Sequence, residues 1–374
     1  MKRYPAFDPP EYVVWTRDEK ALAEFRERLS ADAERKAVVD ALSLDQRLDL
    51  YRGLLRTRLT DIALKRWVRQ GVISKAWLGT GEEATTVGPV HALRRPGPQS
   101  SVLDPRCDVV APMIRNSGAC TEMGMAVADI FRAYMGTEDG PSRGRDGHYG
   151  SIRHGVIPPI SHVGDMVPVV TGIALTFTMR GTDQVAMTWI GDGSAKAGVA
   201  HEGLNFAAVQ RAPVVFIIQN NQVALGTRLE QHHIASDPTP FADWPQAYGV
   251  WGGVFDGNNV LDAYALTAIA VKRCREGAGP ALLVAETFRM GGHATHDEAE
   301  ARETFDPALF ERWGRRDPIG LYEEYLVDDG VSRDTLTAIE AEVEAEVERA
   351  QEEALESRRD RLPAGESATV GVYA

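Results

Sequence analysis

A carboxylate and an amide each follow a short apolar segment of the chain. Asp192 comes just after VAMTWI (185–190), and Asn221 comes just after VVFIIQ (214–219). The two residues are 29 positions apart, the length of one strand–helix–strand unit, so both side chains should reach the same carboxyl edge of a parallel sheet. Ligands bind at that edge in this class of fold. A carboxylate, an amide oxygen and a nearby backbone carbonyl form a hard oxygen set that suits magnesium or calcium.

The residues that follow Asp192 favour a phosphate. Gly193 and Ser194 should open a helix, whose free backbone N–H groups attract anions. A metal-bridged diphosphate would satisfy both halves of the site. A GDG tripeptide by itself is usually only a turn. The dinucleotide fingerprint is excluded because Lys196 stands where its third glycine belongs, and no GK[ST] phosphate loop is present.

The middle of the chain alternates between strand and helix patterns. VAMTWI, VVFIIQ and ALLVAET (281–287) are continuous apolar runs, as expected for buried parallel strands. Helical patterns fit between them at 198–210 and 260–276. This alternation predicts an α/β fold, a doubly wound parallel sheet flanked by helices.

The flanking segments predict three regions. Residues 1–41 mix prolines and aromatics with charged residues, and we expect an N-terminal arm that needs a partner's surface. An α/β domain should occupy 42–330 and begin with a long amphipathic helix over 42–70, with Gly71 as a plausible stop. Residues 331–374 should form a C-terminal helix and tail. That helix should be a solvated surface helix that packs one stripe, formed by Ile339, Val343, Val347, Ala350 and Ala354.

Composition narrows the class of protein. Hydrophobic residues at 44% and charged residues at 25% are ordinary for a globular chain. The formal net charge of −13 should repel a phosphate backbone, so no nucleic-acid partner is expected. Three widely spaced cysteines form no CxxC pair, which indicates neither a disulfide scaffold nor a thiolate zinc site. With no export signal or membrane-spanning apolar run, a cytoplasmic location is expected.

Longer stretches resemble one known family. GDG followed about thirty residues later by NN resembles the thiamine diphosphate fingerprint, and HEGLNFAAVQRAPVVFIIQNN (201–221) is similar to the alpha subunit of the heterotetrameric 2-oxoacid dehydrogenases. The resemblance spans roughly 45–318. Other matching segments, in order, are GEEA (81–84), IRNSG (114–118), SHVGDMVPVVTGIA (161–174), FDGNN (255–259) and FRMGGHATHD (288–297).

The resemblance implies a thiamine diphosphate-binding fold that holds its cofactor through Mg²⁺. The implied metal ligands are Asp192, the side chain of Asn221 and the carbonyl of Val223. Gly193 and Ser194 would contact the phosphates through their backbones.

The remaining implied contacts come from three other segments. Arg115 matches the arginine that pairs with the terminal phosphate, a role that suits a guanidinium fork. The main chain of Ser161 and Val163 falls where the family holds the aminopyrimidine ring, and a bulky side chain there helps to bend the cofactor.

His293 is the candidate catalytic residue and a further cofactor contact. It lies in GGHATHD, where the glycines permit close approach, and a histidine beside a diphosphate can donate a hydrogen bond or move a proton. Taken alone, a loop histidine is usually a surface residue. A zinc pair with His296 lacks a third soft ligand. Arg289 is expected to support the same loop.

The chain also departs from the family pattern. Ile114 and Gln219 stand where the family usually has tyrosine and an arginine or other polar anchor, so the grip on the phosphates should differ. His162 and Asp165 replace apolar, small polar or amide residues. Ala294 stands where animal relatives carry a regulatory serine, so that phosphorylation switch cannot operate.

The implied activity is thiamine diphosphate-dependent oxidative decarboxylation of a 2-oxoacid, pyruvate or a branched-chain 2-oxoacid, with transfer of the acyl group to a lipoyl group. The implied partners are a beta subunit, in an assembly of two alpha and two beta chains, and the lipoyl-bearing acyltransferase. The beta chain should supply the glutamate that activates the aminopyrimidine. An acetoin dehydrogenase alpha subunit and a catalytically silent cofactor-binding or structural subunit remain alternatives.

Overall fold

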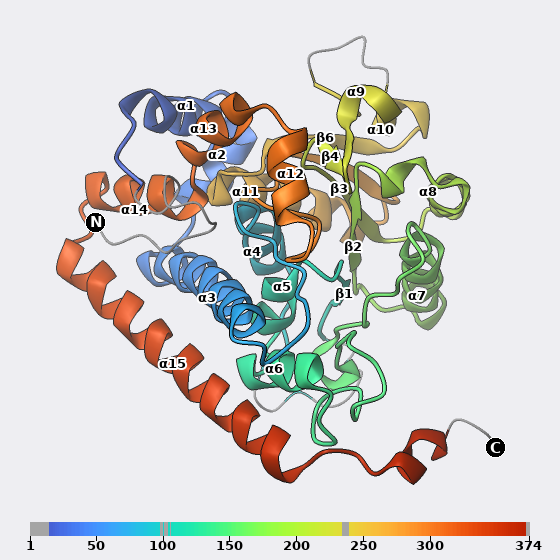
Figure 1. The fold of residues 1–374 in the computed structure, drawn as a ribbon. Helices are drawn as coiled ribbons and strands as arrows, with labels where there is room; N and C mark the ends of the chain where they lie inside the picture. The colour runs from blue at the N-terminus through green and yellow to red at the C-terminus, as the bar shows by residue number, and fades with distance from the viewer. Residues whose placement is uncertain (1–14, 98–99, 101–103, 105, 234–238, 372–374) are drawn as a thin grey trace.

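A five-stranded parallel sheet forms the centre of the molecule (Figure 1). The structure is a computed structural model, and it describes residues 15–97, 100, 104, 106–233 and 239–371. The strand order is β1-β2-β3-β7-β6. The strands are β1 (Val109–Ala111), β2 (Ala186–Gly191), β3 (Val214–Asn220), β6 (Trp251–Asp256) and β7 (Ala281–Glu286).

Helices cover both faces of the sheet, because every second residue of the central strands points to the opposite side. In β3, Val215 and Ile217 belong to one hydrophobic core and Phe216 and Ile218 to the other. The first core packs against α3 (Leu44–Arg69), α4 (Ala84–His91), α5 (Ser117–Glu122) and α11 (Val260–Arg275). The second packs against α7 (Met166–Arg180), α8 (Gly198–Gln210) and α10 (Trp244–Ala247). The predicted doubly wound parallel sheet is confirmed.

Local signals set the ends of the predicted helices. Ser43 caps α3 and forms a capping box with Gln46, and Gly71 just beyond the helix has a φ of 71° that favours glycine. The helix expected over 198–210 is α8, and the one expected over 260–276 ends at Arg275. All three helices are therefore confirmed.

Residues 15–41, the described part of the predicted N-terminal arm, pack on their own chain. They form α1 (Glu19–Ser30) and α2 (Ala33–Asp40), and Leu22 and Phe25 are buried in the main core. Arg28 Nε and Arg35 Nη1 lie 2.9 and 2.7 Å from the fully buried carboxylate of Asp262 in α11. The proline-rich part of the predicted arm, residues 1–14, lies outside the described residues.

The C-terminal helix runs along the outside of the fold. α15 (Arg333–Asp360) runs alongside α3 and packs against α6 (Val127–Met135), as Figure 1 shows. The predicted stripe is buried, which confirms a surface helix that packs along one side. Its buried residues are Leu336, Ile339, Val343, Val347, Ala350, Ala354 and Ser357.

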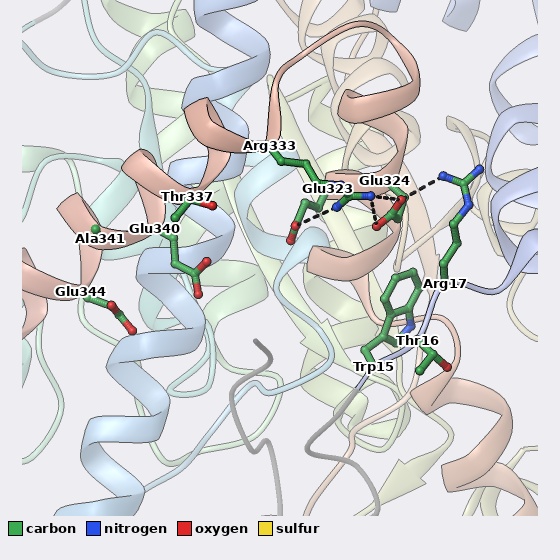
Figure 2. Close-up of a pocket in the computed structure, with 10 residues that line it drawn as sticks. All are labelled: Trp15, Thr16, Arg17, Glu323, Glu324, Arg333, Thr337, Glu340, Ala341 and Glu344. Atoms are coloured by element: carbon green, nitrogen blue, oxygen red, sulfur yellow. Dashed lines mark hydrogen bonds and ion pairs between the residues drawn. The ribbon is translucent and has the colours of Figure 1, made fainter. Parts of the chain in front are cut away.

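A hollow of about 640 Å³ lies where α15 meets α14 (Pro318–Asp328) and the start of the described chain (Figure 2). Its wall is an ion-pair cluster in which Arg17 Nη1 and Arg333 Nη2 lie 2.9 and 3.0 Å from Glu324 Oε2. Glu324 is almost fully buried. These contacts hold the first described residues against the last two long helices.

The remaining elements are short connections. They are η2 (Ile152–His154), η3 (Ser194–Lys196), β4 (Val223–Ala224), β5 (Thr227–Arg228), α9 (Leu229–His232), α12 (Glu298–Thr304), α13 (Pro307–Gly314) and η4 (Gly365–Thr369). No helix among the described residues is both long and apolar enough to cross a membrane.

Candidate active site

Asp192 and Asn221 leave neighbouring strands at the same edge of the sheet. Gly191 at the end of β2 pairs with Gln219 near the end of β3, so the two residues emerge side by side, as their spacing predicted. Both side chains are buried, at 2% and 0% exposure. The Asn221 oxygen accepts from the backbone of Val223 at 3.2 Å. The Asp192 Oδ2 has no hydrogen-bond partner among the described residues.

Glu82, a residue to which the sequence assigned no role, contacts several polar side chains at this edge of the sheet. It lies just before α4 and accepts from Gln219 Nε2 at 2.6 Å and from Asn221 Nδ2 at 3.0 Å. Its other oxygen lies 3.7 Å from Arg115 Nε. Gln219, one of the departures from the family pattern, is fully buried and orients Glu82 instead of projecting a cation.

Arg115 and His293 meet from different segments. Arg115 Nη1 lies 3.5 Å from His293 Nδ1, and the arginine is 8% exposed. Asp297 holds the histidine loop, because its carboxylate accepts from the backbone N–H of His293 at 3.1 Å and of Ala294 at 2.8 Å. Burial, together with the positive charges of Arg115 and Arg289, lowers the pKa of His293 to about 4. The imidazole is therefore neutral at pH 7.

Arg289 clamps two loops together, as expected for a residue that supports the His293 loop. It donates to the carbonyls of Gly291, Val223 and Leu225 at 3.0, 3.3 and 3.0 Å. Burial, followed by the charge of Arg115, lowers the pKa of Arg289 to about 10. The Val223 carbonyl keeps a second lone pair for a metal ion.

The GDG turn lies against the hairpin formed by β4 and β5. A Cβ at Gly193 would lie only 2.5 Å from the Ala224 Cβ, so glycine is needed for this approach. Ser194 starts the short η3 turn, and α8 begins only at Gly198. The helix expected to open at Gly193 and Ser194 is thus preceded by one turn of 3₁₀ helix.

The predicted aminopyrimidine loop is exposed. Ser161, His162 and Val163 precede α7, and Val163 is 64% exposed. The Ser161 hydroxyl lies 3.4 Å from His148 Nε2. No hydrogen bond or ion pair within the described part of the chain joins this loop to Asp192 or Asn221, although Gly164 packs against Ala197 at the start of α8.

Several buried polar atoms at this edge make no hydrogen bond among the described residues. They are Glu82 Oε2, Arg115 Nε, Asp192 Oδ2 and both ring nitrogens of His232. Buried polar groups are normally paired, so this cluster indicates a polar ligand. A carboxylate for a metal ion, with a guanidinium and an imidazole for phosphates, fits a metal-bound diphosphate. Within the described ranges no three His, Cys, Asp or Glu side chains could hold a metal, so amide and carbonyl oxygens are needed.

The sequence is similar to known proteins over most of its length. Residues 51–362 match the family model of the dehydrogenase E1 component. The chain belongs to this family. The 2-oxoisovalerate dehydrogenase subunit alpha of Bacillus subtilis is 30% identical over 79% of this chain and 86% of the relative. The pyruvate dehydrogenase E1 component subunit alpha of Acholeplasma laidlawii is 30% identical over 76% of each chain. The 3-methyl-2-oxobutanoate dehydrogenase subunit alpha of Mycobacterium tuberculosis is 31% identical over 75% of this chain and 71% of the relative.

Family membership confirms the resemblance found in the sequence. The predicted enzyme, an alpha subunit of a 2-oxoacid dehydrogenase first component, is confirmed, and so is its E1 alpha fold. The matching relatives include both pyruvate and branched-chain types. An E1 component of this family depends on thiamine diphosphate, and an alpha subunit implies a beta subunit.

Proposed function

We propose that this E1 alpha chain binds Mg²⁺ and thiamine diphosphate at the carboxyl edge of β2 and β3. With a beta subunit it would oxidatively decarboxylate a 2-oxoacid, pyruvate or a branched-chain 2-oxoacid, and pass the acyl group to the lipoyl group of an acyltransferase. The buried atoms of Glu82, Arg115 and Asp192 that make no hydrogen bond are the observation that carries the proposal. When bound, the cofactor supplies the carbon centre that attacks the keto group.

Each predicted residue has a task in this proposal. Asp192, Asn221 and the Val223 carbonyl hold the metal, and the backbones of Gly193 and Ser194 approach the phosphates. Arg115 and His293 reach the phosphates from the other side, where Arg115 supplies charge and the neutral imidazole can donate a hydrogen bond. Ser161 and Val163 hold the aminopyrimidine ring, in a loop exposed enough for a second chain to cover.

The exposed apolar face of α7 and α8 supports a beta-subunit surface. Met179, Phe206 and Val209 are 85%, 48% and 69% exposed on these two neighbouring helices. Val163, in the proposed aminopyrimidine loop before α7, is also 64% exposed. Apolar patches of this kind mark protein interfaces. We propose that the beta chain covers this face and closes the cofactor site, in an assembly of two alpha and two beta chains.

Substitutions on this face test the docking surface. Met179→Asp and Val209→Asp should prevent assembly with the beta chain in size-exclusion chromatography with light scattering. Leu362→Asp is the matched control, because Leu362 is 60% exposed at the far C-terminal tail. Normal assembly of both helix variants would contradict the proposal that the beta chain docks on this face.

The decisive test of activity uses the assembled complex of both chains. Co-expression with the candidate beta chain should give reduction of an artificial acceptor with pyruvate or branched 2-oxoacids, and the isolated chain should be inactive. Asp192→Ala should abolish magnesium-dependent thiamine diphosphate binding in calorimetry while the circular dichroism spectrum is unchanged. An assembled complex that binds the cofactor but turns over no 2-oxoacid would favour the silent subunit, the alternative suggested by Ile114 and Gln219.

The proposed location is cytoplasmic. Cys107, Cys120 and Cys274 are buried and free, which supports a reducing compartment.

A further inference from the structure

A histidine outside the family motifs lies against the proposed metal site. The hairpin of β4 and β5 follows Asn221, and α9 folds back from it, so that His232 Nε2 lies 3.5 Å from Asp192 Oδ2. The histidine side chain is only 14% exposed. Within the described chain, neither ring nitrogen of His232 nor this oxygen of Asp192 has a hydrogen-bond partner. Two buried polar groups thus face each other, and no other described residue satisfies them.

The neighbouring histidine is differently placed. His233 stacks on Phe241 with ring centroids 4.2 Å apart, and its Nδ1 contacts the ammonium group of Lys196. The Lys196 ammonium in turn lies 4.7 Å from the centroids of the Phe241 and Trp244 rings. His233 therefore belongs to an aromatic cluster, and His232 alone of the pair approaches Asp192.

We propose that His232 is a fourth protein ligand of the metal ion, through Nε2. The inference rests on the proposed function, which places the metal on Asp192, Asn221 and the Val223 carbonyl. Adjacent ligand atoms of an octahedral ion with bonds of about 2.1 Å are ~3 Å apart. The 3.5 Å between His232 and Asp192 is close to that separation.

A nitrogen ligand changes the metal that the site prefers. Mg²⁺ favours oxygen, whereas imidazole suits Mn²⁺, Ni²⁺ and other transition metals. The assembled enzyme should therefore take a transition-metal ion more tightly than an all-oxygen site would. The site would bind Mg²⁺ when Mg²⁺ is abundant. Ni²⁺ or Mn²⁺ would replace Mg²⁺ at concentrations lower than that of Mg²⁺.

The test uses the assembled alpha–beta complex with thiamine diphosphate and Mn²⁺ as the probe. Pulsed electron paramagnetic resonance should detect directly coordinated ¹⁴N in the wild type. His232→Gln should lose that coupling, and His233→Gln should retain it. In calorimetry with thiamine diphosphate, His232→Gln should weaken Ni²⁺ binding ~10-fold or more, and Mg²⁺ binding less than about threefold.

The outcomes separate this inference from the proposed function. Glutamine still donates a hydrogen bond to Asp192, so unchanged Ni²⁺ affinity in His232→Gln would reduce the histidine to a hydrogen-bond donor and overturn the inference. Wild-type Mn²⁺ without nitrogen coupling would do the same. If Asp192→Ala also kept its metal-dependent cofactor binding, the metal placement in the proposed function would fail. Loss of binding in Asp192→Ala with no nitrogen coupling in the wild type would refute only the role of His232.

Discussion

The Nδ1 atom of His293 lies 3.5 Å from the Nη1 atom of Arg115, although 178 positions separate the two residues. Arg115 follows β1 in the chain, and His293 lies in the loop that follows β7. In the sheet, β1 and β7 lie on opposite sides of β3. Burial and a cation this close lower the pKa of His293 and keep its imidazole neutral. An incoming diphosphate would meet a fixed positive charge and a polarisable ring in one place.

His293→Ala should lower the turnover of the assembled enzyme ~100-fold or more if the imidazole moves a proton or stabilises charge along the reaction path. Cofactor affinity should change less. If His293 only anchors a phosphate, affinity falls first, and saturating thiamine diphosphate restores the rate. Steady-state kinetics at several cofactor concentrations separate the two roles. Wild-type turnover together with wild-type cofactor affinity in His293→Ala would show that His293 has no role in catalysis or cofactor binding.

Cofactor binding should take up protons. The pKa of His293 is about 4 before the cofactor binds, because of burial and of Arg115 and Arg289. Negative phosphates favour the protonated ring and raise this pKa. Between pH 4 and the raised pKa, binding should therefore add protons, and affinity should fall as pH rises through the raised pKa. Calorimetry in two buffers of different ionisation enthalpy measures the uptake. His293→Gln should reduce it, and equal uptake in both proteins would show that another group titrates.

The sequence predicted the parts of the fold that depend on local pattern. Asp192 and Asn221 could be placed together because each directly follows a strand and one helix joins the two strands. The edge strand β6, WGGVFD, was missed, since two glycines and half-buried positions hide its pattern. β1 is only three residues long.

The part of the site that was missed depends on packing between distant segments. Glu82 reaches Gln219 across 137 positions, and no spacing rule connects them. The position of His232 depends on the direction in which the short hairpin of β4 and β5 turns the chain back towards Asp192. No pattern in the sequence specifies that direction. The GEEA match pointed to the right segment but assigned no role to Glu82.

Arg35→Ala should reduce the free energy of unfolding by ~2–3 kcal/mol, because the fully buried Asp262 would lose one of its two arginine partners. The lost bond to β6 adds to this, since Arg35 Nη2 also donates to the Val254 carbonyl at 3.0 Å. Urea denaturation measures the change. Lys36→Ala on the same helix is the matched control, because its ion pair with Asp40 is exposed and should contribute less than about 0.5 kcal/mol. Equal effects of the two substitutions would show that the buried ion pair of Arg35 and Asp262 does not hold α2 in place.

Glu122 should make the fold sensitive to acid. Burial alone would raise its pKa, but the hydrogen bond from His91 at 2.7 Å and the charge of Arg56 at 2.6 Å outweigh burial and lower the pKa to about 2. The folded pKa is below the ordinary value of 4.5, so the folded state binds the Glu122 proton less readily than the unfolded state does. The stabilisation is therefore complete above about pH 4.5 and is lost as pH falls towards 2.

Glu122→Gln tests this dependence. Its destabilisation should be on the order of 2–3 kcal/mol at pH 6 and should shrink as pH falls from 4.5 to 3, where the Glu122 carboxyl of the unfolded wild type takes up a proton while the folded carboxylate stays ionised. Urea midpoints at pH 6, 4.5 and 3 measure the difference. Glu346→Gln is the matched control, because Glu346 contacts the same Arg56 but is 38% exposed, and its effect should be small at each pH. A Glu122→Gln effect that stayed constant from pH 6 to pH 3 would mean that shape and packing, and not the charge of this carboxylate, hold α5 against α3.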